Sequence, residues 1–104
     1  MKDGHYNLSL TADGYCGIGE LSLNDNRGQA QDGKFKIQLH LQGQGPKLAG
    51  IANVLMSPQV LQNSRLPEHY SLNMTGTERG DSFSLIGIGP LGLIVEISAE
   101  RLSA

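Results

Sequence analysis

The side chains that could carry catalysis or bind a metal are one cysteine and three histidines. Cys16 could act as a nucleophile if His5, His40 or His69 served as its base. The spacing neither supports nor excludes such a pair, and it does not match a pattern of metal ligands. His5 and His40 alternate with apolar residues, so we expect solvated imidazoles on the polar side of a strand. We therefore predict no enzyme activity, no metal site and no cofactor.

Catalysis by paired carboxylates would require two of them to converge in a cleft. Most of the acidic residues instead stand beside turn signals or on the polar side of alternating segments, where solvated charge is expected. They are Asp3, Asp13, Glu20, Asp25, Asp32, Glu68, Glu78, Asp81, Glu96 and Glu100. The acidic residues thus add no support for an enzyme.

Residues 87–92 read Gly-Ile-Gly-Pro-Leu-Gly and match the GxGxxG pattern of dinucleotide-binding proteins. Such a site needs a helix directly after the glycines, because the helix N-terminus meets the pyrophosphate. Residues 93–97 alternate as a strand does, so we predict a glycine-rich connection between two strands. Gly17 and Gly19 fall inside another expected strand. They indicate either a close backbone approach to a ligand or a bend or bulge that helps a sheet to curl.

Apolar and polar residues alternate with a period of two in several segments, which is the pattern of strands buried on one face. In the clearest segment, residues 34–42, the apolar positions are Phe35, Ile37, Leu39 and Leu41. The same alternation covers residues 5–10, 70–75, 83–87 and 93–100. The sequence therefore predicts an antiparallel sheet with one solvent-exposed face and one buried face.

Turn signals separate these segments. The chain has 14 glycines, about twice the ordinary share of ~7%. Asp13-Gly14, Asp32-Gly33 and Arg79-Gly80-Asp81 stand where hairpin turns need a positive φ. Such short connections favour pairing between strands that are neighbours in the sequence. If the sheet closes on itself, its apolar face is buried and its edges are paired. We therefore predict an all-β fold, a closed antiparallel up-and-down barrel.

Residues 46–69 are ambiguous. Leu48, Ile51, Ala52 and Leu55 fit a helical stripe, while every second residue from 48 to 56 fits a strand equally well. Ser57-Pro58 is a typical helix start, with serine as the N-cap and proline at the first position. We favour a strand over roughly residues 48–55, followed by a helical turn over residues 58–62.

Length and charge exclude several classes of protein. A chain of 104 residues has room for one domain, so residues 1–104 are expected to form one barrel. A net charge of −2, eight scattered basic residues and only five aromatic residues argue against a nucleic-acid partner. No apolar segment has the ~20 residues that span a bilayer, and no signal peptide is evident, so we expect a cytoplasmic protein without a membrane partner.

The apolar side of the strands would line the barrel interior. Small barrels either fill the interior with their own side chains or hold one apolar ligand there. The residues that would line such a pocket are Tyr6, Phe35, Leu39, Tyr70, Met74 and Phe83. On the outside, Ile18, Ile88 and Ile94 could form a dimer patch or be ordinary scattered surface residues.

Several short motifs together resemble the GrlR-like family, small bacterial regulators that repress type III secretion genes. The matching stretches are Met1–Tyr6, Gly17–Gly19, Thr75–Thr77, Gly80–Phe83, Gly87 and Arg101–Leu102. These motifs lie toward both ends of the chain, in regions that together cover about half of it, and residues 43–69 do not align.

The resemblance implies an eight-stranded, lipocalin-like barrel that forms a homodimer and binds a transcriptional activator without catalysis. Founding members of the family present an acidic run to the activator. The corresponding region here, residues 29–36, holds only Asp32 and two lysines, so no functional residue is carried over. The leading hypothesis is a non-enzymatic regulator that binds another protein, such as a transcriptional regulator. The alternative is a carrier or sensor of a small apolar ligand in the barrel interior.

Overall fold

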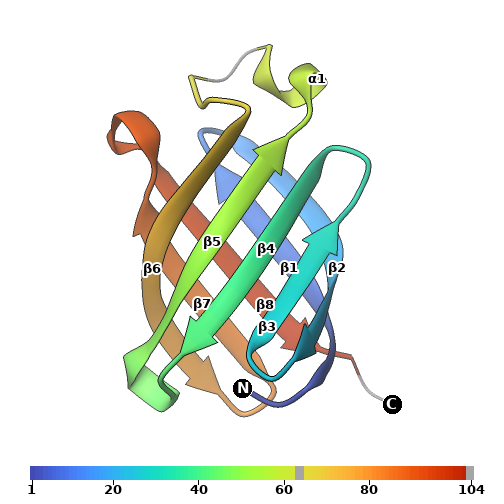
Figure 1. Ribbon diagram of the computed structural model, residues 1–104, viewed down its shortest axis with the longest axis vertical. Coiled ribbons are helices and arrows are strands. Elements are labelled where there is room, and N and C mark those ends of the chain that lie inside the picture. The colour runs from blue at the N-terminus through green and yellow to red at the C-terminus, as the bar shows by residue number, and fades with distance from the viewer. Residues whose placement is uncertain (63–64, 103–104) are drawn as a thin grey trace.

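The computed structural model describes residues 1–62 and 65–102, which form a closed barrel of antiparallel strands (Figure 1). Each strand pairs with the next one in the chain, and β8 pairs back with β1. The strands are β1 (Gly4–Ala12), β2 (Tyr15–Asn24), β3 (Arg27–Gln31), β4 (Phe35–Gln42), β5 (Leu48–Met56), β6 (His69–Arg79), β7 (Ser82–Ile88) and β8 (Ile94–Arg101). The predicted up-and-down barrel of eight strands is confirmed.

The alternation of the sequence places one side of each strand inside. In β4 the four apolar residues from Phe35 to Leu41 are at most 3% exposed, while the residues between them face outward. Every buried side chain among the described residues is hydrophobic, and these side chains form one continuous core. Burial of this face is the main favourable contribution to the stability of the barrel.

Two hairpin turns have positive φ at both central residues, whereas Gly33, which the sequence predicted to need a positive φ, does not have one, so that prediction is wrong. Asp13 and Gly14, between β1 and β2, have φ values of 47° and 82°. Asp25 and Asn26, between β2 and β3, have φ values of 53° and 62°. Positive φ at both central residues follows the right-handed twist of the flanking strands, and Asp, Asn and Gly are the residues that tolerate it.

The ambiguous middle of the chain is a strand followed by a short helix. Residues 48, 50, 52, 54 and 56 of β5 are all buried, so the strand interpretation is confirmed and the helical stripe is wrong. Helix α1 covers Pro58–Leu61. Ser57 is the N-cap residue and Pro58 stands at the start of the helix, as predicted, but the Ser57 side chain makes no capping hydrogen bond.

The segment around α1 lies over one end of the barrel (Figure 1). Val60 and Leu61 pack against the core, and Leu66 is only 5% exposed. Arg65 ties this segment to the β1–β2 turn, since its backbone N–H donates to Asp13 Oδ2 at 2.9 Å and its Nη2 donates to Asp13 Oδ1 at 3.0 Å. Among the described residues, no helix has the length and hydrophobicity needed to span a membrane.

Candidate functional site

The six side chains predicted to line the interior all point into the barrel. Their exposed fractions are 0% for Tyr6, 3% for Phe35, 3% for Leu39, 7% for Tyr70, 1% for Met74 and 3% for Phe83. They belong to the continuous core and are not grouped around a single point. The rings of Tyr6 and Phe83 meet edge to face, with centroids 5.8 Å apart. Phe35 meets the ring of Tyr15 in the same way at 6.3 Å.

The two glycines in β2 serve this aromatic packing. A Cβ at Gly17 would lie 2.8 Å from Phe35 Cε1, and a Cβ at Gly19 would lie 3.3 Å from Phe35 Cζ. The pairing of β2 with β1 runs without interruption from Tyr15 to Leu23, so no bulge is present. The groups that lie close to these glycines are the chain's own aromatic rings, those of Tyr15 and Phe35 at Gly17 and that of Phe35 at Gly19.

Two buried side-chain hydroxyls, those of Ser57 and Tyr70, lack a hydrogen-bond partner among the described residues. The hydroxyl of Tyr70 is buried and forms no hydrogen bond within the described residues. Desolvation by burial raises the pKa of Tyr70 above the ordinary 10.0, because the ionised form would lose its hydration. The hydroxyl of Tyr6, in contrast, donates to the carbonyl oxygen of Lys2.

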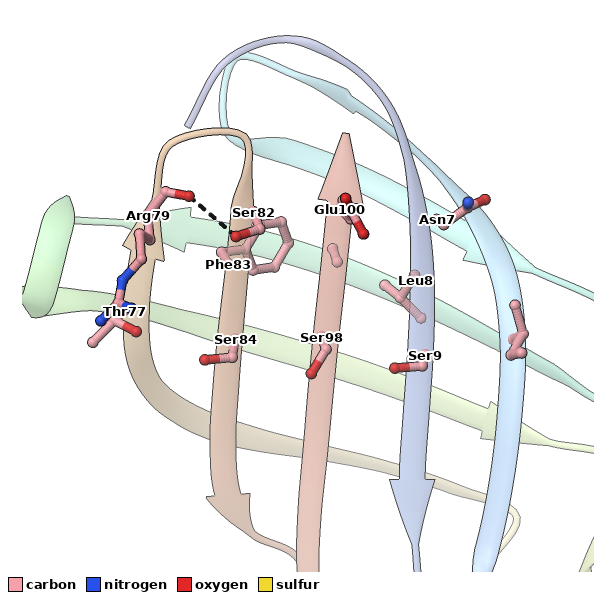
Figure 2. Close-up of a pocket in the computed structure, with 12 residues that line it drawn as sticks. Asn7, Leu8, Ser9, Thr77, Arg79, Ser82, Phe83, Ser84, Ser98 and Glu100 are labelled. Carbon is pink, nitrogen blue, oxygen red and sulfur yellow. Dashed lines mark hydrogen bonds between the residues drawn. The ribbon is translucent and has the colours of Figure 1, made fainter. Parts of the chain in front are cut away.

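The largest hollow described lies on the outside of the barrel. It has a volume of about 750 Å³ and is open to solvent. Figure 2 shows that Ser84, Ser98 and Ser9 stand side by side on β7, β8 and β1 among the lining residues. The register explains this row, since Ser98 pairs with both Ser84 and Ser9. We call these three residues the serine row.

The row continues onto both neighbouring strands. Ile18 of β2 pairs with Ser9, and Thr77 of β6 pairs with Ser84. Ile18 is 69% exposed, so one end of the row carries an uncovered apolar side chain. Glu100 and Arg79 line the same hollow and supply charges of both signs (Figure 2). The hollow thus offers hydroxyl, apolar and charged groups over five adjacent strands.

The hollow offers hydroxyl groups that can form hydrogen bonds with a partner. None of the three hydroxyls of the serine row makes a hydrogen bond to another described residue, so each is free to donate to and accept from a partner. The described lining contains no histidine or cysteine that could activate a serine. Because serine side chains are short, another chain could approach the sheet closely along the row.

A serine, a histidine and a glutamate also meet elsewhere on the outer surface. Ser22 Oγ lies 3.1 Å from His5 Nδ1, and Glu20 Oε1 lies 3.4 Å from the same nitrogen. In a catalytic triad the serine and the acid contact opposite ring nitrogens, and the site excludes water. Here both contact one nitrogen, and the His5 and Glu20 side chains are more than 60% exposed. This cluster fails the geometric requirement for nucleophilic catalysis.

Cys16 does not join a histidine in this hairpin. Cys16 is exposed and pairs with Thr11, whereas His5 pairs with Ser22, six residues further along β2. At about 3.3 Å per residue, the two positions are on the order of 20 Å apart. In residues 1–62 and 65–102, no group of three or more His, Cys, Asp or Glu side chains could hold a metal ion.

Ile18, Ile88 and Ile94 point outward, as predicted, with 69%, 72% and 56% of each side chain exposed. Sequence reasoning did not identify the serine row. Its members are 75 and 14 residues apart in the chain, and each looks like an ordinary polar residue of an alternating strand. Only the strand register brings them together.

Fold and site define a class: an antiparallel barrel whose interior is occupied by its own side chains and whose largest described hollow is on the outer face. No model of a known protein family matches the chain, and no curated protein matches it.

Proposed function

We propose that this protein is a non-enzymatic regulator that binds another protein through the serine row and its flanks. The observation that carries the proposal is the position of the 750 Å³ hollow, on the outer face of β2, β1, β8, β7 and β6. A barrel that worked as an enzyme or a carrier would place its chemistry in an enclosed and mostly apolar pocket.

The composition of the hollow favours a protein surface as the occupant. It presents hydroxyl groups, the exposed Ile18 side chain, and the charges of Glu100 and Arg79 over a wide, open area. Protein interfaces combine an apolar centre with a polar rim and carry about one hydrogen bond per 100–200 Å². A small molecule would leave much of such an open surface in contact with water.

The resemblance to the GrlR-like family supports the same proposal. Regulators of that kind act in the cytoplasm, form homodimers and bind a transcriptional activator. The acidic run that those regulators use is absent here, and the serine row offers a different binding surface. We propose a homodimer that binds a protein partner, with repression of type III secretion genes as the process suggested by the resemblance.

A matched pair of arginine variants tests this proposal. Ser98→Arg places a long charged side chain in the middle of the serine row, whereas Gln38→Arg makes the same kind of change on the outer face of β4. Proteins captured from the native organism should be lost with Ser98→Arg and retained with Gln38→Arg. Capture of no protein, or equal capture by both variants, would contradict the proposal. Light scattering on the same samples measures whether the wild type is a dimer.

One observation favours the second candidate function, a carrier of a small apolar ligand. The unpartnered hydroxyl of Tyr70 could donate to a polar atom of a molecule held in the interior. Such a ligand would need ~300 Å³ or more, so core side chains would have to move aside. Organic extraction of protein purified from the native host, followed by mass spectrometry, tests this function. A stoichiometric apolar compound would support it, and an empty extract would eliminate it.

A further inference from the structure

The connection between β7 and β8 ends in a group of uncovered apolar side chains. Ile88 and Ile94 form the last pair of the β7–β8 ladder, and Ile86 lies two residues before Ile88 on the same outer face. Leu91 stands at the tip, in the 3-10 turn η2 (Pro90–Gly92). We call these four residues the apolar hairpin end. Their exposed fractions are 47% for Ile86, 72% for Ile88, 76% for Leu91 and 56% for Ile94.

The usual alternation of polar and apolar residues stops at this end of the hairpin. At the opposite end of the β7–β8 ladder, the outward residues include Ser84, Ser98 and Glu100. From residue 86 to residue 95 no side chain is polar or charged. Turns at the ends of strands are normally polar, because they face water on most sides. The stability of the barrel does not require apolar residues at these exposed positions.

Leu91 departs from a second rule at the same place. Its φ and ψ are 61° and 18°, in the left-handed region that favours glycine and asparagine. Two backbone hydrogen bonds fix the turn, from Gly89 N–H to the Leu93 oxygen at 2.7 Å and from Leu93 N–H to the Pro90 oxygen at 3.2 Å. A large apolar residue is thus held in an unfavourable conformation with its side chain in water. Residues that break two local rules together are those expected to serve a function.

The size and charge of the group indicate what kind of partner it fits. At these exposures the four side chains uncover on the order of 400 Å², about half of the ~800 Å² that each partner in a standard interface buries. The interface of a homodimer formed through this group alone would therefore be too small to be stable. Glu96 pairs with Ile86, and its carboxylate would be repelled by an anionic bilayer. A narrow projecting tip suits a concave pocket.

We propose that the apolar hairpin end inserts into an apolar pocket of a protein partner, with Leu91 as the central side chain. This inference rests on the proposed protein-binding function but assigns a surface separate from the serine row. Leu91 would fill the pocket, and Ile88 and Ile94 would cover its rim. Fixing Leu91 in the bound conformation lowers the conformational entropy lost on binding.

Leu91→Asn separates binding from folding. Asparagine tolerates the left-handed conformation better than leucine does, so the variant should be at least as stable as the wild type. It removes the apolar side chain and should weaken binding about tenfold or more. Ile51→Thr is the matched control, since it removes apolar surface from the outer face of β5, where Ile51 is 45% exposed. This control should bind as the wild type does.

The partner is found by photo-crosslinking, with p-benzoylphenylalanine placed at position 91 or, as a control, at position 51 in the native organism. We expect a protein that crosslinks from position 91 only. With that protein purified, calorimetry should show the tenfold loss for Leu91→Asn and none for Ile51→Thr. Crosslinks only to a second copy of the chain, no crosslink specific to position 91, or flotation with phosphatidylcholine–phosphatidylglycerol vesicles would overturn the inference.

The two proposals fail in different ways. A partner that binds Leu91→Asn normally but does not bind Ser98→Arg would overturn the apolar insertion and leave the serine row as the binding surface. A partner that binds both variants normally would overturn both proposals.

Discussion

Replacing Tyr70 by phenylalanine should stabilise the barrel. The hydroxyl of Tyr70 is buried and unpartnered, so the folded state carries the desolvation cost of a polar group, about 1–3 kcal/mol, without a compensating hydrogen bond. Phenylalanine keeps the ring and removes this cost. We expect the free energy of unfolding to rise by about 1 kcal/mol, which corresponds to an increase in Tm of about 4 °C in a domain of this size.

Tyr6→Phe is the matched control. The Tyr6 hydroxyl donates to the carbonyl oxygen of Lys2, and its ring packs against Phe83. Removing this hydroxyl eliminates its hydrogen bond to Lys2, which should lower the free energy of unfolding by about 1 kcal/mol. Urea denaturation followed by circular dichroism at pH 7 measures both variants. The reasoning is refuted if Tyr70→Phe is destabilised as much as Tyr6→Phe, because Tyr70 would then have a partner that stabilises it.

Three further predictions concern pH, backbone crowding and the barrel end. The folded-state pKa values of Tyr6, Tyr15 and Tyr70 are raised above 10.0, chiefly by burial. The folded state therefore holds these protons more tightly than the unfolded state, so the tyrosine contribution to stability should be constant below about pH 10 and should be lost as the pH rises above it. Denaturation between pH 9 and pH 11.5 should show this fall, less steeply for Tyr70→Phe. Gly76→Ala places a Cβ 1.8 Å from the Ser84 carbonyl oxygen and should prevent folding or cost at least about 3 kcal/mol. A Cβ at Gly33 meets nothing within 4 Å, so Gly33→Ala should be neutral in the same urea denaturation assay. Asp13→Asn weakens the pair with Arg65, which is 68% exposed, so it should cost at most about 1 kcal/mol. Hydrogen exchange at the Arg65 amide should become faster in that variant, and an unchanged exchange rate would show that the pair does not hold the segment.

The sequence was sufficient to predict the barrel because the strand signal is periodic and repeated. In β4 the alternation of Phe35, Ile37, Leu39 and Leu41 with polar residues matches the observed burial at every position. In β5 the same alternation competed with a helical stripe, and pairing with β4 and β6 decided for the strand. Local propensity is a weak signal where neighbouring strands provide the partners.

Other features depend on contacts between distant segments and could not be predicted. Gly17 and Gly19 suggested a bulge or a ligand, but they make room for Phe35, which comes from a strand that is not their neighbour. The serine row depends on the pairing of β8 with both β1 and β7. The left-handed conformation of Leu91 is set by two backbone hydrogen bonds, not by a preference of leucine.

The most direct test of the account is an amide NMR titration with the purified protein partner, which reports where on the barrel the partner binds. The account predicts large shifts at Ser9, Ser84 and Ser98, on the outer face of β1, β7 and β8, and at the apolar hairpin end around Leu91. Shifts confined to Phe35, Tyr70 and their neighbours inside the barrel, with the serine row unaffected, would contradict it.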